Sequence, residues 1–325
     1  MKTIKVSHLW TAGKAFIENS VIFNLFKNLA NKEVVFTSPL KADLLILGPY
    51  NLDSISHKII KGVTKRINNK IIHDYLTLIQ KQIFFRKIPP LTVFYSHENF
   101  REDSIKCDFS ITDNLGVIKD NHLRFPYWKE NINWSEYKIK RSDDNLNFKR
   151  FGGQYCIDEL SRPQGNFFLK KKDICIFSSH MIEPRRTIYE IFSKNFNVDG
   201  FGPYFDKDIK NHNSSNFSKK DIMVNYSINL CPNNFIYPGY YGEKVPEAFL
   251  GKCLPVTWCD QNINFDFNEK AFVNLNYYFY DSFKEIIYLL KQKEFLEGFS
   301  DQPLLIKKPD LNKEIEFIKK ILSCL

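Results

Sequence analysis

The sequence lacks the features that mark several common protein classes. None of its apolar runs approaches the about 18–20 residues that a membrane-spanning helix needs. It contains no G-x-G-x-x-G, G-x-x-x-x-G-K-[ST] or G-x-S-x-G motif, which argues against a dinucleotide-dependent oxidoreductase, a P-loop NTPase and an α/β-hydrolase. Glycine and proline number only 13 and 14 in 325 residues. Collagen-like and low-complexity classes are therefore excluded.

The cysteines form no recognisable framework. There are seven, an odd and widely spaced set without a C-x-x-C pair or a Cys/His cluster at zinc-ligand spacing. The N-terminal stretch 1–6 carries two lysines and no apolar signal-peptide core follows it. These patterns predict a cytoplasmic protein with reduced thiols and no secretion signal.

A formal net charge of +9 favours an anionic partner: nucleic acid, an acidic membrane face or a phosphorylated small molecule. The basic run Lys170-Lys171-Lys172 lacks the alternating aromatic residues of an RNA-binding platform, so nucleic acid is not expected. Asp206-Lys207-Asp208 has the D-x-D form of a metal site in nucleotide-sugar transferases. Because Asn- and Ser-rich sequence surrounds it, we interpret it as a solvated loop and predict no metal site.

Continuous apolar segments alternate with amphipathic ones, the pattern of parallel sheets covered by helices on both faces. The expected strands are 4–9, 33–37, 44–47, 92–96 and 109–112 in the first half, and 174–177, 198–200 and 227–231 in the second. The expected helices are 15–29, 186–196, 282–293 and 312–322. The fold class is thus α/β with two halves.

The composition changes between residues 138 and 172, where basic clusters and a Gly152-Gly153 pair occur, and this change indicates a linker. The predicted domains are 1–160, 161–300 and a C-terminal basic amphipathic helix, 301–325. Two interpretations of that helix stay open. In the first, the helix lies on an anionic membrane surface; in the second, it packs on the body of the protein with its lysines in solvent.

The segment 229–258 contains the highest density of candidate functional residues and is expected to form a strand, a loop, a helix and a second strand. Glu243 and Lys244 stand where the helix begins, so Lys244 and the free amides of the first turn could face a phosphate together, while Glu243 accepts hydrogen bonds from hydroxyls. The alternative is an ordinary helix start with an exposed lysine.

Several separate blocks in order resemble the signature of the bacterial α-1,3-fucosyltransferases, glycosyltransferase family 10. They are Phe94-Tyr95-Ser96-His97-Glu98-Asn99, Cys107–Ile111, Leu123–Pro126, Ser178–Arg186, Val198–Gly202, Phe235–Phe249, Pro255-Val256-x-Trp258 and Asp266–Asn274. The resemblance covers about residues 4 to 290.

The resemblance implies a GT-B architecture: two Rossmann-like α/β domains facing across a cleft, with the acceptor bound mainly by the N-terminal half and GDP-fucose by the C-terminal half. It implies an inverting transfer from a GDP-sugar to a hydroxyl of a glycan such as lipopolysaccharide, without a cofactor or an essential divalent metal. The implied site residues are Glu98 as general base, Arg186 (or Arg185) and Lys244 on the diphosphate, and Glu243, Tyr240 and Asn234 as other donor contacts.

The sequence departs from the family pattern at four positions. Asn233 replaces a glutamate, Gly242 a threonine, Cys259 a glycine, and His97 stands where glycine is common. The transferred sugar is therefore fucose or a related sugar. Two alternatives remain, a GT-B transferase using another GDP-, UDP- or CMP-sugar, and a catalytically silent glycan-binding relative. The expected location is the cytoplasm, with peripheral association on the inner face of the membrane as an option.

Overall fold

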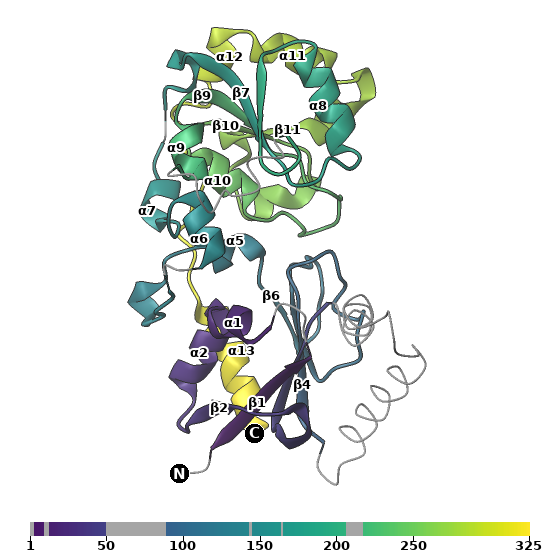
Figure 1. Cartoon of the computed structure of the whole chain (residues 1–325), viewed down its shortest axis with the longest axis vertical. Coiled ribbons are helices and arrows are strands. Elements are labelled where there is room, and N and C mark those ends of the chain that lie inside the picture. Colours follow the sequence, from purple (N-terminus) through teal and green to yellow (C-terminus); the bar gives the residue numbers. More distant parts are fainter. Residues whose placement is uncertain (1–2, 10–12, 50–88, 143–144, 164, 206–216) are drawn as a thin grey trace, which may run out of the picture. The chain divides into compact units, whose positions relative to one another are not determined.

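A computed structural model of the chain describes residues 3–9, 13–49, 89–142, 145–163, 165–205 and 217–325 (Figure 1). The chain folds into two compact units, each built on one sheet. Unit 1 comprises Met1–Phe125, Trp134–Arg141 and Asp310–Leu325, and unit 2 comprises Pro126–Asn133 and Ser142–Pro309. The two-half α/β prediction is confirmed.

The sheet of unit 1 is parallel throughout, in the order β2-β1-β3-β4-β5-β6. Its strands are β1 (Ile4–Leu9), β2 (Val34–Phe36), β3 (Leu44–Leu47), β4 (Leu91–Tyr95), β5 (Phe109–Thr112) and β6 (His122–Arg124). All four residues of β3 are buried, as its continuous apolar run predicts. The three-residue strand β6 was not predicted, because so short a segment carries no periodicity.

The predicted helix 15–29 is two helices, α1 (Gly13–Glu18) and α2 (Val21–Leu29). Ser20 lies between them with an extended backbone, and its hydroxyl accepts a hydrogen bond from the Phe23 amide at 3.2 Å. A serine that caps a new helix in this way satisfies an amide that the helix start leaves unpaired. The predicted single helix is therefore interrupted at Ser20, which caps the start of α2.

The C-terminal helix α13 (Asn312–Ser323) packs against α2 in unit 1. Phe317, Ile318 and Ile321 are buried, and the Phe317 ring lies 5.7 Å from that of Phe109, edge to face. The lysines of the helix are exposed. The interpretation as a helix packed on the body is confirmed, and the apolar face is covered by its own unit.

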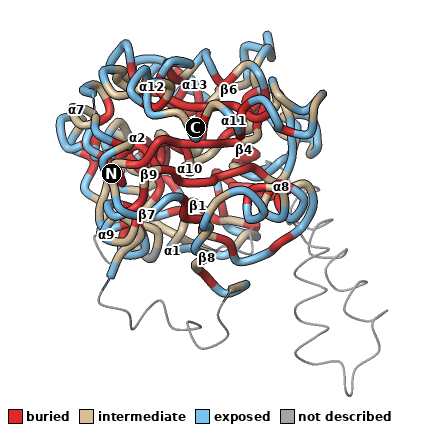
Figure 2. The backbone as a smooth tube through the Cα atoms, turned by 90° about the horizontal axis from the view of Figure 1, so that it is seen from above, coloured by how far each residue is buried: buried red, intermediate tan, exposed pale blue. Residues whose placement is uncertain are grey.

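The sheet of unit 2 is also parallel, in the order β11-β10-β9-β7-β8. Its strands are β7 (Lys172–Phe177), β8 (Val198–Phe201), β9 (Tyr226–Leu230), β10 (Leu254–Thr257) and β11 (Val273–Asn274). The central strands of both sheets are largely buried (Figure 2), whereas the edge strands β2 and β8 contain no buried residue.

Helices cover both faces of the unit 2 sheet. The first face packs against α8 (Arg185–Ser193), α11 (Lys284–Leu290) and α12 (Lys293–Glu297). The second packs against α9 (Lys219–Met223), beside which lies α10 (Lys244–Leu250). Three short helices complete the unit: α5 (Tyr127–Glu130), α6 (Leu146–Phe151) and α7 (Ile157–Leu160). No helix within the described residues is long and apolar enough to cross a membrane.

The units differ from the predicted boundaries at residues 160 and 301. Residues 142–160 belong to unit 2, because Tyr155 exchanges backbone hydrogen bonds with Asn131 and Asn133 at 2.7 and 2.9 Å. The C-terminal segment is also divided. Residues 301–309 belong to unit 2, whereas 310–325 complete unit 1.

Candidate functional site

The strand order of unit 2 has a reversal point between β7 and β9. From β7 the chain moves to β8 on one side and later returns to β9 on the other. Open α/β sheets bind ligands outside the carboxyl ends of the strands at such a point. The loops that follow β7 and β9 carry the predicted donor-binding residues, so topology and sequence select the same edge.

Arg185, at the start of α8, fixes these two loops to each other. Its guanidinium is buried, and Nη1 donates to the Ser178 hydroxyl at 2.9 Å and to the His180 carbonyl at 2.8 Å. Nη2 donates to the Pro232 carbonyl at 3.4 Å and to Oδ1 of Asn234. One guanidinium thus holds the β7 and β9 loops in a defined arrangement.

Lys244 is the first residue of α10, as predicted, and its ammonium donates to the Pro232 carbonyl at 3.1 Å. Burial lowers the pKa of Lys244 to about 8, and the positive charge of Arg185 acts in the same direction. A lysine held close to its titration point next to an arginine is a site that an anion would stabilise. The edge therefore has the electrostatic character of an anion-binding site.

The other predicted donor residues lie close to this pair. Asn234 contacts Arg185 directly. Burial lowers the pKa of Arg185, whereas the charge of Glu243 and the Tyr240 side chain oppose that shift. Asn234 therefore contacts this guanidinium, Lys244 shares its Pro232 acceptor, and Glu243 and Tyr240 act on it electrostatically.

That guanidinium belongs to Arg185 and not to Arg186, which the resemblance ranks first. The Arg186 side chain is exposed on α8. Arg185 is largely occupied by protein acceptors, and its role in the structure is to hold loops and supply positive charge. Arg186 stays a prediction as a direct phosphate contact.

The departures from the family pattern differ in their structural context: Asn233 makes a side-chain contact, Cys259 is buried, and Gly242 is not required by the space around it. Asn233 is buried, and its Nδ2 donates to the Tyr240 carbonyl at 3.3 Å, which closes the loop after β9. The backbone amide of Cys259 donates to Oδ1 of Asn274 at 3.3 Å, and burial raises the pKa of the Cys259 thiol. At Gly242 a Cβ would meet only the Tyr127 ring, at 3.7 Å. A larger residue would fit there.

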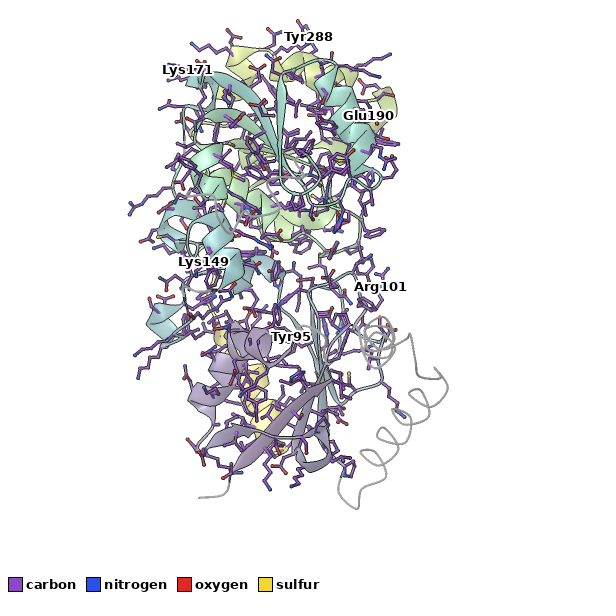
Figure 3. The ribbon with its side chains drawn as sticks, viewed as in Figure 1. Tyr95, Arg101, Lys149, Lys171, Glu190 and Tyr288 are labelled. Atoms are coloured by element: carbon purple, nitrogen blue, oxygen red, sulfur yellow. The ribbon has the colours of Figure 1, made fainter. Side chains whose placement is uncertain are left out.

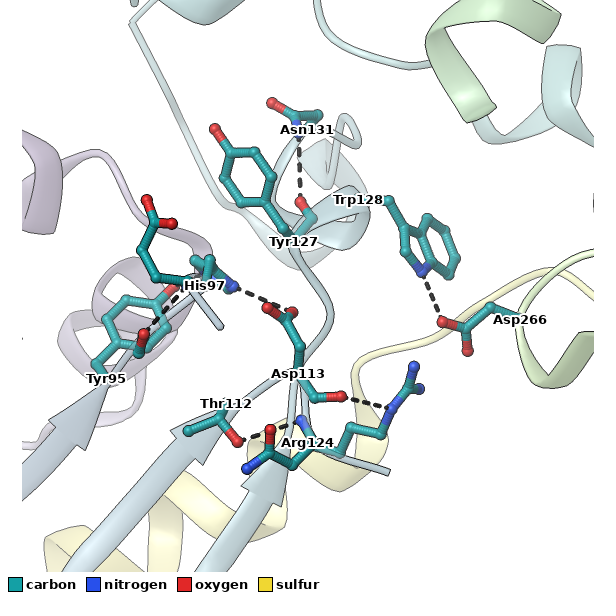
Figure 4. Close-up of polar contacts among 12 residues, drawn as sticks. Tyr95, His97, Thr112, Asp113, Arg124, Tyr127, Trp128, Asn131 and Asp266 are labelled. Carbon is teal, nitrogen blue, oxygen red and sulfur yellow. Dashed lines mark hydrogen bonds and ion pairs between the residues drawn. The ribbon is translucent and has the colours of Figure 1, made fainter. Parts of the chain in front are cut away.

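Glu98 follows β4 at the carboxyl edge of the unit 1 sheet. Its side chain is exposed, and its backbone amide donates to the Ser96 hydroxyl at 3.1 Å. The preceding His97 contacts Tyr95 and Asp113 (Figure 4). Asp113 was not singled out from the sequence, although its place directly after the buried strand β5 is a signal that could have identified it.

Other candidate features have a structural role or lie outside the described part. Asp206, Lys207 and Asp208 fall outside the described residues. Within the described ranges, no group of three or more His, Cys, Asp or Glu side chains could hold a metal ion.

Two of the three lysines in the run Lys170-Lys171-Lys172 make contacts within the protein. Lys170 donates to the Lys252 carbonyl, and Lys172 contacts Asp199 at 3.1 Å and the Tyr226 hydroxyl at 2.9 Å. Lys171 projects from the surface of unit 2, as does Tyr288 (Figure 3). The three lysines therefore do not form a shared phosphate clamp.

Comparison with known proteins agrees with the motifs. An α-(1,3)-fucosyltransferase of Helicobacter pylori is 24% identical over 249 residues, which are 71% of this chain and 51% of the relative. The chain thus spans about half the length of the curated relative that it matches. No protein-family model matches the chain.

The fold matches solved structures over 99% of this chain and 90% of each of theirs. One is a crystal structure of α1,3-fucosyltransferase, with a TM-score of 0.64 and 21% identity. The other two are crystal structures of α1,3-fucosyltransferase with GDP-fucose and with GDP, each with a TM-score of 0.63 and 20% identity. The resemblance predicted from the motifs is confirmed, and so is the α/β fold class of the GT-B type.

Proposed function

We propose that the protein is an inverting glycosyltransferase that moves fucose, or a related sugar, from a GDP-sugar to a hydroxyl of a glycan acceptor such as lipopolysaccharide. The observation that carries this proposal is the pair of cations, Arg185 and Lys244, at the reversal point of the unit 2 sheet. The solved structures that share this fold include complexes with GDP-fucose and with GDP. A nucleoside diphosphate is therefore the ligand class best matched to this edge.

The proposed chemistry assigns one role to each unit. Transfer with inversion needs a carboxylate that accepts the proton of the incoming hydroxyl while the sugar passes through an oxocarbenium-like state. Glu98, exposed at the end of β4, has the required chemistry. The departing GDP gains negative charge on its β-phosphate, which Lys244 and the arginine pair of α8 would stabilise. Glu243, Tyr240 and Asn234 would hold the rest of the donor.

The reaction is proposed to need no divalent metal, since two or three cations of the chain are available to neutralise the diphosphate. Turnover in excess EDTA equal to turnover in Mg²⁺ is the expected result. A strict requirement for Mg²⁺ or Mn²⁺ would contradict this part of the proposal and direct attention to Asp206 and Asp208.

The first experiment is a thermal-shift titration with GDP, UDP, CMP and GDP-fucose. A ligand that binds only the folded protein at about 100 times its dissociation constant stabilises it by about 2.7 kcal/mol. Selective stabilisation by GDP, reduced in Lys244→Ala, is the expected result. Stabilisation by UDP or CMP instead would favour the alternative donor class, and no response to any nucleotide would contradict the donor site.

The donor sugar and the catalytic competence need a turnover assay. Release of GDP from a panel of GDP-sugars in the presence of glycan acceptors distinguishes fucose from related sugars. It also distinguishes the enzyme from a silent glycan-binding relative. Release from no GDP-sugar, despite tight GDP binding, would favour the silent relative.

We further propose a cytoplasmic location with peripheral association at an anionic membrane. Because the apolar face of α13 is buried in unit 1, such association would depend on exposed lysines such as Lys319 and on charge. Co-sedimentation with anionic vesicles that is abolished at high salt is expected. Equal pelleting with neutral and anionic vesicles would contradict the electrostatic mechanism.

A further inference from the structure

His97 stands directly before Glu98, and both nitrogens of its imidazole have partners (Figure 4). Nε2 lies 3.0 Å from the Tyr95 hydroxyl, and Nδ1 lies 3.5 Å from Oδ1 of Asp113. A neutral ring with its proton on Nδ1 donates to the carboxylate and accepts from the hydroxyl. A protonated ring donates to both. In either state the side chain has a partner on each side.

Aromatic side chains pack against the imidazole ring. The Tyr95 ring meets the imidazole edge to face at 5.0 Å, and the Phe125 ring lies 6.0 Å away. The side chains of His97 and Asp113 are only 7% and 5% exposed. The Asp113 carbonyl accepts a hydrogen bond from Nε of Arg124 at 3.2 Å. The imidazole is thus held across the carboxyl ends of β4, β5 and β6.

This arrangement determines the backbone that carries Glu98. The buried His97 side chain fixes one residue of the turn, and the bond from the Glu98 amide to the Ser96 hydroxyl fixes the next. Phe100 then donates its amide to the Glu98 carbonyl at 2.6 Å. A glycine at position 97 would leave this turn more conformational freedom. In this chain a packed side chain supplies the restraint.

We propose that His97 is a positioning residue: the chain of contacts Tyr95–His97–Asp113 sets the direction in which Glu98 presents its carboxylate. The inference rests on the proposed function, in which Glu98 accepts the proton of the acceptor hydroxyl. A base displaced by about 1 Å loses on the order of 10²-fold in rate. The restraint would therefore act on turnover and leave GDP-sugar binding in unit 2 unchanged.

The test compares His97→Ala and His97→Gln with a matched control, His122→Ala. His122 lies on β6 of the same sheet, and its Nδ1 is 3.0 Å from the Ser110 hydroxyl, so its removal also deletes one histidine–hydroxyl contact. His97→Ala is expected to lower kcat by about 10- to 100-fold with the KM for the GDP-sugar within twofold. His97→Gln, which keeps a hydrogen-bonding group, should recover much of that loss, and His122→Ala should keep the wild-type kcat.

The outcomes separate this inference from the function on which it rests. If Glu98→Gln is inactive while His97→Ala turns over like the wild type, the inference is wrong and the proposed function stands. If Glu98→Gln turns over like the wild type, or if no GDP-sugar is used, the proposed function fails and the inference fails with it. If His97→Ala does not fold, Asp113→Asn replaces it, and an unchanged kcat in that variant overturns the inference.

Discussion

Lys244 and Arg185 donate to the same acceptor, the carbonyl oxygen of Pro232, at 3.1 Å from Nζ and 3.4 Å from Nη2. Two cations thus converge on one backbone oxygen at the carboxyl edge of the unit 2 sheet. A single carbonyl dipole compensates two full charges poorly, and the pKa of Lys244 falls to about 8 through burial and the charge of Arg185. The site gains stability when an anion arrives.

This relationship predicts that GDP affinity depends on pH. Below about pH 8 the Lys244 amine is protonated and, in the proposed function, would pair with the diphosphate, whereas above that pH binding would first have to add a proton. The association constant is expected to be flat near pH 7 and to fall by up to about tenfold per unit above pH 8. Isothermal titration calorimetry from pH 6.5 to 9.5 measures it. Lys244→Ala should give a flat profile, and a flat wild-type profile would contradict the assignment.

Lys244 should also reduce the stability of the ligand-free protein. Its folded-state pKa of about 8 lies below the 10.5 of an unperturbed lysine, so the unfolded chain binds more protons between these values, and stability rises with pH across that window. The penalty is complete below pH 8. Lys244→Met should raise the free energy of unfolding at pH 7 by about 1–3 kcal/mol, discounted for partial exposure. Urea unfolding at pH 7 and pH 10 tests this, since the gain must shrink at pH 10.

The two neighbouring arginines should separate stability from binding. Arg185→Ala removes bonds to two loops and leaves their acceptors unpaired, so we expect a loss of about 2–4 kcal/mol in unfolding free energy. Arg186→Ala, on the exposed side of α8, should change stability by less than about 0.5 kcal/mol. If Arg186 contacts the diphosphate, its removal weakens GDP binding about tenfold. Unchanged affinity in Arg186→Ala would assign the cationic role to Arg185 alone.

Replacing the proposed base should affect turnover only. Glu98→Gln is expected to lower kcat by about 10²- to 10⁴-fold, while the dissociation constant for GDP stays within twofold. Glu102→Gln is the control, because Glu102 lies in the same loop but pairs with Lys119 at 2.9 Å and with Asn114 at 3.1 Å. Loss of turnover in both variants, with equal loss of stability, would indicate damage to the loop instead of loss of a base.

A buried ion pair one turn into α10 should be important for stability. Glu247 Oε2 lies 2.7 Å from Nζ of Lys219, and the two side chains are 8% and 27% exposed. Glu247→Gln leaves the lysine without its counter-charge and should cost about 3–5 kcal/mol. The double variant Lys219→Met/Glu247→Leu should recover part of that loss, as measured by chemical unfolding. A double variant no more stable than Glu247→Gln would show that the pair itself is not the cause.

Most strands were predictable, because a fully buried strand such as β3 is a continuous apolar run, preceded here by Asp43 and ended by Gly48-Pro49. The helix against which α13 packs was not predictable from the sequence. An amphipathic pattern tells which face of a helix is buried but not what covers it, and the cover here is α2, nearly three hundred residues earlier. The break at Ser20 was readable in principle, since serine is a preferred helix cap.

The residues proposed as donor contacts on the β9 loop could be grouped from the sequence, because they follow one strand and precede one helix. The choice between Arg185 and Arg186 depends on the rotation of α8. Arg185 shares its face with Ile188 and Phe192, three and seven residues on, and both are buried. That spacing indicates the inward-facing arginine. The contact between His97 and Asp113 depends on the register of β4 against β5, which one sequence does not specify.

Because α13 closes the apolar face of unit 1, the order of synthesis does not match the order of completion. The residues of the unit 1 sheet leave the ribosome before those of unit 2, but Phe317, Ile318 and Ile321 follow only after all of unit 2 has been made. Unit 2 consists of the segment Ser142–Pro309 and the short stretch Pro126–Asn133, so all of its residues have been made before α13. The nascent chain therefore carries an uncovered sheet face until α13 has been made, and a chain interrupted after residue 309 would remain exposed to aggregation and proteolysis there.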